Sequence, residues 1–177
     1  ETIKDKGRLS NIYIAIEGTK RASEKARQLA KSLGAFPFVL SKKDKVYHHI
    51  CCVIASNFLT ALIGEIEQIG RKKIRINGFN KLSFFNIYKP LAIQTLDNIA
   101  ANGATKSLTG PIERNDLKTI IKHIEALGSL PEDLLSMYFL MGIETVKLAL
   151  KKKSISSKEA KAILNTFSKY IKINKID

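Results

Sequence analysis

From Lys43 onward the chain carries apolar residues at helical spacing, and this pattern constrains its fold more than any other feature. Apolar side chains that recur every three or four residues form one face of a helix, whereas strands show alternation. Turn and capping residues divide the stretch into separate helices. The predicted helices cover residues 43–70, 82–101, 116–127 and 129–152, and a last one starts at residues 156–159. We therefore predict a mainly α domain over residues 43–177, with its second helix kinked or interrupted at Pro90.

The first 42 residues show a different pattern. Residues 11–17 (NIYIAIE) alternate like a strand, residues 19–33 are typical of an amphipathic helix that Gly34 should end, and residues 36–40 are typical of a short buried strand. A strand–helix–strand unit of this length is normally a parallel, right-handed crossover. Two strands alone are too few for a stable sheet. Residues 1–42 are therefore predicted to be the last portion of an open α/β domain.

Two short sequences predict where the last two helices begin. Ser129-Leu130-Pro131-Glu132 fits the capping box, in which a Ser is followed three residues later by a Glu, and Ser156-Ser157-Lys158-Glu159 is predicted to start the last helix. The first of them also places a Pro early in its helix, where Pro is tolerated.

Composition narrows the class of protein. Hydrophobic residues make up 45% of the chain and charged residues 26%, which is ordinary for a soluble globular protein. The richest apolar run, residues 50–66, is interrupted by polar residues, so we expect no membrane-spanning segment and no membrane partner. No signal peptide is recognisable, and a cytoplasmic location is expected.

The two cysteines, Cys51 and Cys52, are adjacent. Neighbouring residues of a helix point about 100° apart and cannot form a disulfide without severe distortion. No second Cys/His cluster accompanies them, so we expect no metal site. The preferred interpretation is two small apolar side chains in a packed helix in a reducing compartment.

The net charge of +14 raises the possibility of nucleic-acid binding. Much of the excess lies in the lysines of residues 147–177, which are spread around helices without an arginine-rich stripe of interleaved aromatic residues. A solvated basic face is the preferred interpretation, and we expect no nucleic-acid partner.

The loop at residues 108–116 is a candidate anion site. Gly110 and Pro111 predict a tight turn, Asn115 or Asp116 can cap the following helix, and Arg114 stands beside that helix N-terminus. Free backbone N–H groups and a nearby guanidinium together attract anions. An ordinary loop with a good cap is the alternative, and spacing alone favours it.

A second segment, Tyr47-His48 followed by Ser56-Asn57 on one helix, combines with this loop into a pattern. With Thr109-Gly110-Pro111, Arg114 to Asp116 and a downstream His123, the chain resembles the C-terminal helical domain, itself of unknown function, of bacterial Rossmann-like oxidoreductases over about residues 10–150. That family belongs with the pyrroline-5-carboxylate reductase and 6-phosphogluconate dehydrogenase group. One departure is Asn115, where the family has Gly; Asn tolerates left-handed geometry better than most residues.

The resemblance implies a 6-phosphogluconate dehydrogenase C-terminal-like helical domain, residues 43–177, for substrate binding and dimerisation. Residues 1–42 would then close a Rossmann-like α/β domain. NAD(P) is the implied cofactor, and because the chain has no Gly-x-Gly-x-x-Gly sequence we expect no cofactor-binding residues here and the dinucleotide-binding part upstream of Glu1. This chain alone is then expected to be inactive.

By the same resemblance, the catalytic candidates are His48, as a proton donor or substrate ligand, with Ser56 and Asn57 as hydrogen-bonding groups. The implied substrate is a small anionic or carbonyl/imine compound. Its predicted binding residues are Tyr47, Thr109, Gly110, Arg114 and Asp116, converging with the catalytic candidates on one cleft. The alternative is structural: Ser56 and Asn57 hydrogen-bond a neighbouring helix and His48 caps a loop.

A homodimer is the expected assembly. Residues 50–69 and 134–150 are more apolar than a single small bundle easily buries, and such surfaces normally mark association. Two other functions stay open at this point: a non-catalytic helical dimerisation or interaction protein, and a basic nucleic-acid-binding module.

Overall fold

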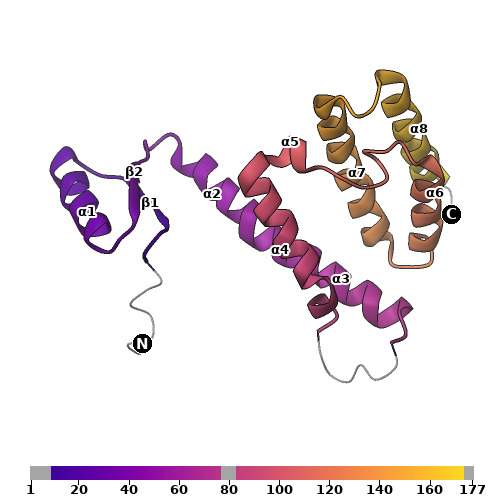
Figure 1. Ribbon diagram of the computed structural model, residues 1–177, viewed down its shortest axis with the longest axis horizontal. Coiled ribbons are helices and arrows are strands. Elements are labelled where there is room, and N and C mark those ends of the chain that lie inside the picture. The colour runs from indigo at the N-terminus through magenta and orange to yellow at the C-terminus, as the bar shows by residue number, and fades with distance from the viewer. Residues whose placement is uncertain (1–8, 77–82, 174–177) are drawn as a thin grey trace. The chain divides into compact units, whose positions relative to one another are not determined.

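The computed structural model describes residues 9–76 and 83–173, and 71% of these residues are helical. By its internal contacts the chain divides into two compact units, residues 1–62 and 63–177. Figure 1 traces the elements in chain order. The mainly helical fold with a short parallel sheet near the N-terminus, as predicted from the sequence, is confirmed. The predicted domain boundary between residues 42 and 43 stays a prediction.

The first unit contains the predicted strand–helix–strand arrangement. Strands β1 (Tyr13–Ile16) and β2 (Phe36–Val39) pair in parallel, with Tyr13 opposite Phe36, and helix α1 (Lys20–Ser32) connects them. Thr19 caps α1, because the Ala22 amide donates to Thr19 Oγ1 at 3.4 Å. The alternating residues 11–17 and the amphipathic residues 19–33 thus contain the strand and the helix that their patterns predict.

A single long helix follows, built from α2 (Lys45–Val53), a π-helical segment η2 (Ile54–Phe58) and α3 (Leu59–Lys73). It begins two residues later and ends three residues later than residues 43–70, the predicted span. The π-helical turn in its middle was not predicted. It holds Ser56 and Asn57, the two polar residues that interrupt the apolar run.

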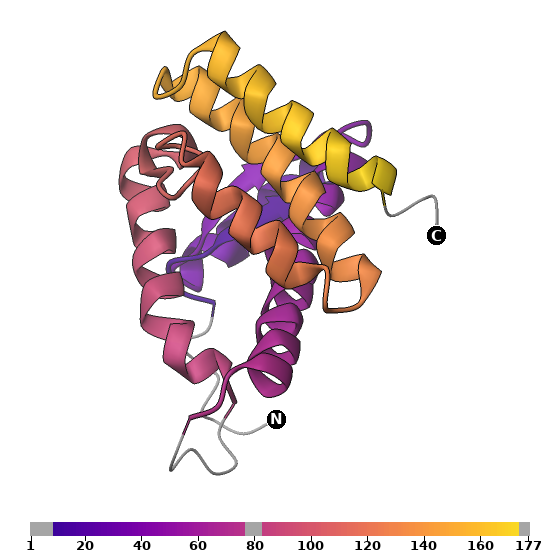
Figure 2. The ribbon, with the colours of Figure 1, turned by 90° about the vertical axis from the view of Figure 1, so that its right-hand side faces the viewer.

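The core of the second unit lies between three helices, α6 (Leu117–Leu127), α7 (Glu132–Lys152) and α8 (Ser157–Ile173), which lie side by side in Figure 2. Ile120, Ile163 and Phe167 are fully buried there. Gly142 of α7 lets the Phe167 ring approach, since a Cβ at this glycine would lie 2.8 Å from the ring. Shape-complementary packing of this kind specifies one arrangement of the three helices.

Helix α4 (Phe85–Asn102) and the short α5 (Ala104–Ser107) precede this core. The predicted start at residue 82 lies outside the described residues, while the predicted end at residues 102–103 is confirmed by Gly103, whose φ of 77° stops the helix. Helix α4 continues through Pro90 and buries none of its own residues. The carboxylate of Glu67 on α3 caps its first turn, accepting from the Phe85 amide at 2.9 Å and from the Ser83 hydroxyl.

The capping box predicted at residues 129–132 is wrong, whereas Ser156 and Glu159 form one. The Ser156 amide donates to the Glu159 carboxylate at 2.7 Å, and the Glu159 amide donates to Ser156 Oγ at 3.3 Å. At residues 129–132 the Ser129 hydroxyl donates instead to the Ala126 carbonyl, and α7 starts after Pro131, its N-cap. The reason is steric, because a box at Ser129 would need Leu130 to be helical and the residue before a proline avoids that conformation.

Candidate functional site

His48 lies on α2, where its imidazole has two neighbours. The edge of its ring meets the Phe38 ring of β2, with centroids 5.7 Å apart, and its Nε2 lies 3.7 Å from Cys52 Sγ one helical turn further on. The side chain is partly buried. These contacts hold the imidazole on the side of the helix that faces β2 and leave it accessible, as a proton donor or acceptor must be.

Ser56 and Asn57 lie in η2, and both are exposed. Within the described part of the chain neither side chain forms a hydrogen bond, so a hydrogen bond to a neighbouring helix, the structural alternative, is not found there. The Ser56 carbonyl accepts from the Thr60 hydroxyl at 2.9 Å. A π-helical turn shifts the register of a helix, and such turns occur frequently at functional sites. In the sequence, only the polar pair Ser56-Asn57 distinguishes this π-helical turn from the helix around it.

Tyr47 projects from a different side of the same helix. It lies with Ile50, Ile54 and Phe58 at helical spacing, and all four side chains are exposed. We call Tyr47, Ile50, Ile54 and Phe58 the apolar stripe. Since consecutive helical residues differ by about 100°, Tyr47 and His48 present neighbouring but distinct surfaces.

The loop at residues 108–116 has the backbone geometry that its sequence predicts. Gly110 adopts a φ of 105° and Asn115 a φ of 53°, so Asn115 occupies the left-handed region as expected for a substitute for glycine. Two contacts from distant residues hold the loop. Lys152 Nζ donates to the Leu108 carbonyl at 2.7 Å and to Glu113 Oε1 at 2.9 Å.

Glu159 holds the other end of the loop, accepting from Asn115 Nδ2 at 2.9 Å. The Ser156 amide and hydroxyl lower the pKa of the Glu159 carboxyl group, and the hydrogen bond from the Asn115 side chain lowers it further by a smaller amount. Sequence reasoning missed Lys152 and Glu159 as loop-holding residues, because nothing local links positions about forty residues apart. The loop is thereby fixed to the end of α7 and the start of α8.

Asp116 is the N-cap of α6, as predicted for either it or Asn115. Its carboxylate accepts from the Thr119 hydroxyl at 2.7 Å and from the Thr119 amide at 3.0 Å. These hydrogen bonds lower the pKa of the Asp116 carboxyl group. The side chains of Thr109 and Arg114 are exposed on the same loop. Asp116 thus accepts a hydrogen bond from one of the backbone amides at the N-terminus of α6. The side chains of Thr109 and Arg114 are then the groups on this loop that can bind an anion.

The remaining histidine, His123 on α6, pairs with Tyr138 of α7. His123 Nδ1 lies 3.1 Å from Tyr138 Oη, and burial raises the pKa of the Tyr138 phenol. This contact fits a packing role for His123.

The predicted site residues therefore fall into two groups. Tyr47, His48, Ser56 and Asn57 belong to the first unit, and Thr109, Gly110, Arg114 and Asp116 belong to the second. Their convergence on one cleft stays a prediction.

Both groups of residues lie within the range matched by one family model. The family model described as a domain of unknown function, DUF2520, matches residues 12–145, which extend from the start of the sheet into α7. The chain belongs to the DUF2520 family. No curated protein and no solved structure matches the chain.

The residues of this DUF2520 chain do not fit a dinucleotide. The turn between β1 and α1 holds one glycine, Gly18, where pyrophosphate binding needs a glycine-rich turn that lets the backbone approach the phosphates. No group of three potential metal ligands occurs within residues 9–76 and 83–173.

The continuous helix Lys45–Lys73, 29 residues long, is long and apolar enough to cross a bilayer by length and composition alone. The expectation that the chain has no membrane-spanning segment stays a prediction. Polar Ser56 and Asn57 interrupt the apolar run in sequence, but the helix continues through them. The apolar window of this helix is not buried in the described structure.

Proposed function

We propose that this DUF2520 chain is the substrate-binding and homodimerisation part of an NAD(P)-dependent oxidoreductase-like protein, with a helical domain of the 6-phosphogluconate dehydrogenase C-terminal type. One observation carries the proposal: a long helix exposes an apolar stripe on one side and the polar group of His48, Ser56 and Asn57 beside it. An association surface and a set of reactive side chains on one helix suit a site built at a dimer interface.

The apolar stripe supports dimerisation. Tyr47 is 67% exposed and Phe58 55% exposed, and on α4 Leu91 is 68% exposed. A stable interface removes roughly 800 Å² per partner from water, and helices this apolar can supply such an area. The stripe contains no charged residue, so a second copy would bring no like charge to its centre. The repulsion between two chains of charge +14 is screened over about 8 Å at physiological salt.

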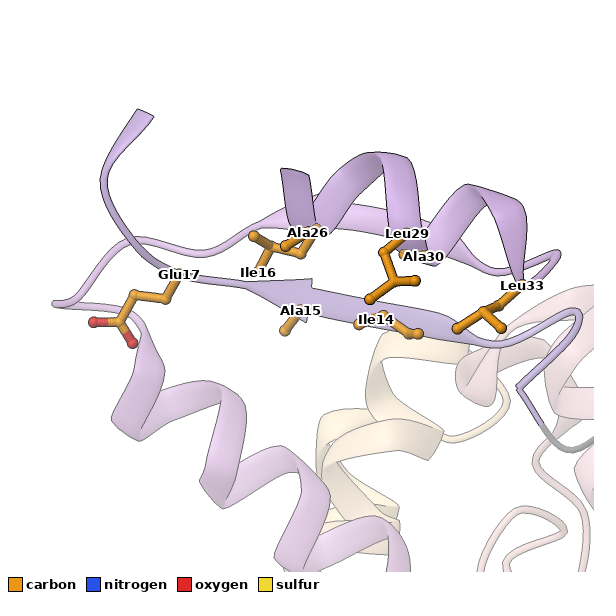
Figure 3. A pocket seen from close by; sticks show the side chains of 8 residues that line it. All are labelled: Ile14, Ala15, Ile16, Glu17, Ala26, Leu29, Ala30 and Leu33. Carbon is orange, nitrogen blue, oxygen red and sulfur yellow. The ribbon is translucent and has the colours of Figure 1, made fainter. Parts of the chain in front are cut away.

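The sheet supports the α/β part of the proposal. An open, apolar groove of about 290 Å³ runs between β1 and α1. Figure 3 shows Ile14 of β1 and Leu29 and Leu33 of α1 facing it. A two-stranded sheet with such a surface is typical of the edge of a larger α/β domain. NAD(P) would be bound by residues outside this sequence.

The chemistry proposed for the chain's own residues is binding and protonation. Reduction of a C=O or C=N group leaves a developing anion or amine that needs a proton, and His48 would donate it. Ser56 and Asn57 would hydrogen-bond the reacting group. Arg114 and Thr109, held in place by Lys152 and Glu159, would bind an anionic part of the substrate. Tyr47, Gly110 and Asp116 would complete the binding surface.

Sedimentation equilibrium of the whole gene product tests the assembly. We expect a dimer for the wild type and a monomer for Ile54→Glu, because a buried carboxylate without a partner opposes association. Leu9→Glu is the matched control, since Leu9 is an exposed leucine outside both apolar segments that are expected to associate. A monomeric wild type at tens of micromolar contradicts the proposal.

Titration of the same protein with NADH and NADPH tests the oxidoreductase part. We expect saturable binding of one of them, detected as a rise in Tm. Binding of neither leaves a non-catalytic helical dimer, the alternative from the sequence.

A lipid bilayer is the second candidate partner of the long helix. The length and apolar composition of this helix, Lys45–Lys73, favour that candidate. Alkaline carbonate washing of cell membranes separates the two possibilities. We expect the protein in the supernatant, and retention in the washed membrane would replace dimerisation by membrane insertion.

A further inference from the structure

Cys52 and His48 form a thiol–imidazole pair on α2. Their Sγ and Nε2 atoms lie 3.7 Å apart, the residues are one helical turn apart, and Cys52 is exposed. The Phe38 ring meets the imidazole edge on with an interplanar angle of 72°, which restricts how His48 can turn. An imidazole held against an accessible thiol is the arrangement that activates cysteine nucleophiles.

We propose that Cys52 is a reactive thiol, a modification site that forms mixed disulfides with small disulfide compounds, and that His48 is its proton acceptor. The thiol proton moves to His48 Nε2, and the Cys52 sulfur attacks one sulfur of the small disulfide. The bond between the two sulfurs of that compound breaks, and its other half leaves as a thiolate that takes up the proton. The small disulfide is the oxidant, and one thiol is released for each thiol consumed.

The neighbouring cysteine supplies an internal comparison. Cys51 is exposed as well, but within the described residues its thiol has no hydrogen bond to a histidine, whereas Cys52 Sγ has one to His48. It points about 100° away from Cys52, so the two sulfurs cannot form a disulfide without severe distortion. A mixed disulfide at Cys52 is therefore not removed by Cys51 and persists until an external thiol reduces it.

The site is compatible with a covered apolar stripe. Cys52 follows Ile50 by two residues, which places it about 200° around the helix from that member of the stripe. Cys52 therefore stays accessible when a second copy covers Ile50. The inference rests on α2 and β2 alone and does not depend on the proposed oxidoreductase function.

The test compares variants of this 177-residue chain that each keep one of its two cysteines. Cys51→Ser leaves only Cys52, and Cys52→Ser leaves only Cys51. At neutral pH each is treated with glutathione disulfide and with 5,5′-dithiobis(2-nitrobenzoate), and the rate of mixed-disulfide formation is measured by mass spectrometry and by absorbance. We expect Cys52 to react about tenfold faster than Cys51, because only Cys52 has a proton acceptor beside it.

Two further variants separate activation from exposure. In the Cys51→Ser background, His48→Gln should lower the rate at Cys52 to that of Cys51. His49→Gln, the matched control one residue along, should leave it unchanged. Equal rates at the two cysteines, or a rate at Cys52 that His48→Gln does not alter, overturns the proposal. If the His48→Gln variant loses its helical circular-dichroism signal and has therefore not folded, the rates at Cys51 and Cys52 alone decide whether the proposal holds.

Discussion

Two helical regions of this chain have similar apolar composition and opposite surroundings. Helices α6, α7 and α8 bury Ile120, Val146 and Phe167 almost completely, and the three helices provide one another's packing partners. The long helix Lys45–Lys73 and helix α4 expose side chains as large as Tyr47 and Leu91. Apolar residues at helical spacing thus specify a helix in both regions, but only contacts far apart in sequence decide whether its apolar face is covered.

The largest expected difference between the regions concerns stability. Phe167→Ala removes a ring that fills the core beside Gly142 and should lower the free energy of unfolding by about 3–5 kcal/mol. Phe58→Ala removes an equally large ring from the apolar stripe. We expect its effect to rise with protein concentration, because only the associated protein covers Phe58.

Denaturant unfolding at several protein concentrations measures both effects. The effect of Phe167→Ala should not vary with concentration. If Phe58→Ala lowers stability equally at all concentrations, the stripe is already covered within one chain, and the contrast between the regions disappears.

A smaller effect is expected at the loop that carries Thr109 and Arg114. Lys152→Met removes the ammonium group that binds the Leu108 carbonyl and the Glu113 carboxylate, leaving both partly buried acceptors without it. We expect a loss of about 1–3 kcal/mol and faster hydrogen exchange at residues 108–116. Lys151→Met is the matched control, because that lysine is exposed. Unchanged exchange in the loop would show that Lys152 does not hold it.

The sequence predicted the parts of this fold that depend on neighbouring residues. The cap at Asp116 and the helix start at Ser156 were predictable because each involves a side chain and a backbone amide within one turn. The left-handed Asn115 was predictable for the same reason. The false capping box at Ser129 shows where a local rule fails, because the proline inside the box excludes the helical conformation that the box needs.

Features that depend on distant residues were beyond the sequence. The clamps from Lys152 and Glu159 join positions about forty residues apart, and the π-helical turn at Ser56 has no distinctive local pattern. Of the candidate site, the residue types and their loop or helix were predictable. The contact between His48 and Cys52 was predictable, because residues four apart on a helix are neighbours on its surface.

The smallest expected effect is a pH dependence at the contact between α3 and α4. The Phe85 amide, followed by the Ser83 hydroxyl, lowers the pKa of the Glu67 carboxyl group to about 2, against an ordinary value of 4.5. The ionised carboxylate therefore stabilises the fold above pH 4.5, and this contribution is lost as the pH falls from 4.5 towards 2.

Thermal unfolding between pH 6 and pH 2.5 checks this prediction. The wild type should lose more Tm over that range than Glu67→Gln, which keeps an acceptor for the Phe85 amide but has no charge to titrate. Equal losses would show that Glu67 does not contribute to the pH dependence of this region.

The central claim is that a second copy of this chain covers the apolar stripe, and cross-linking between copies tests it most directly. Tyr47 is replaced by the photoreactive residue p-benzoylphenylalanine, and the variant is mixed in ¹⁴N and ¹⁵N forms before irradiation. We predict mixed-isotope products that join position 47 to residues of the long helix or of α4. Cross-links formed only within one chain would contradict the account, and so would cross-links between position 47 and lipid in whole cells.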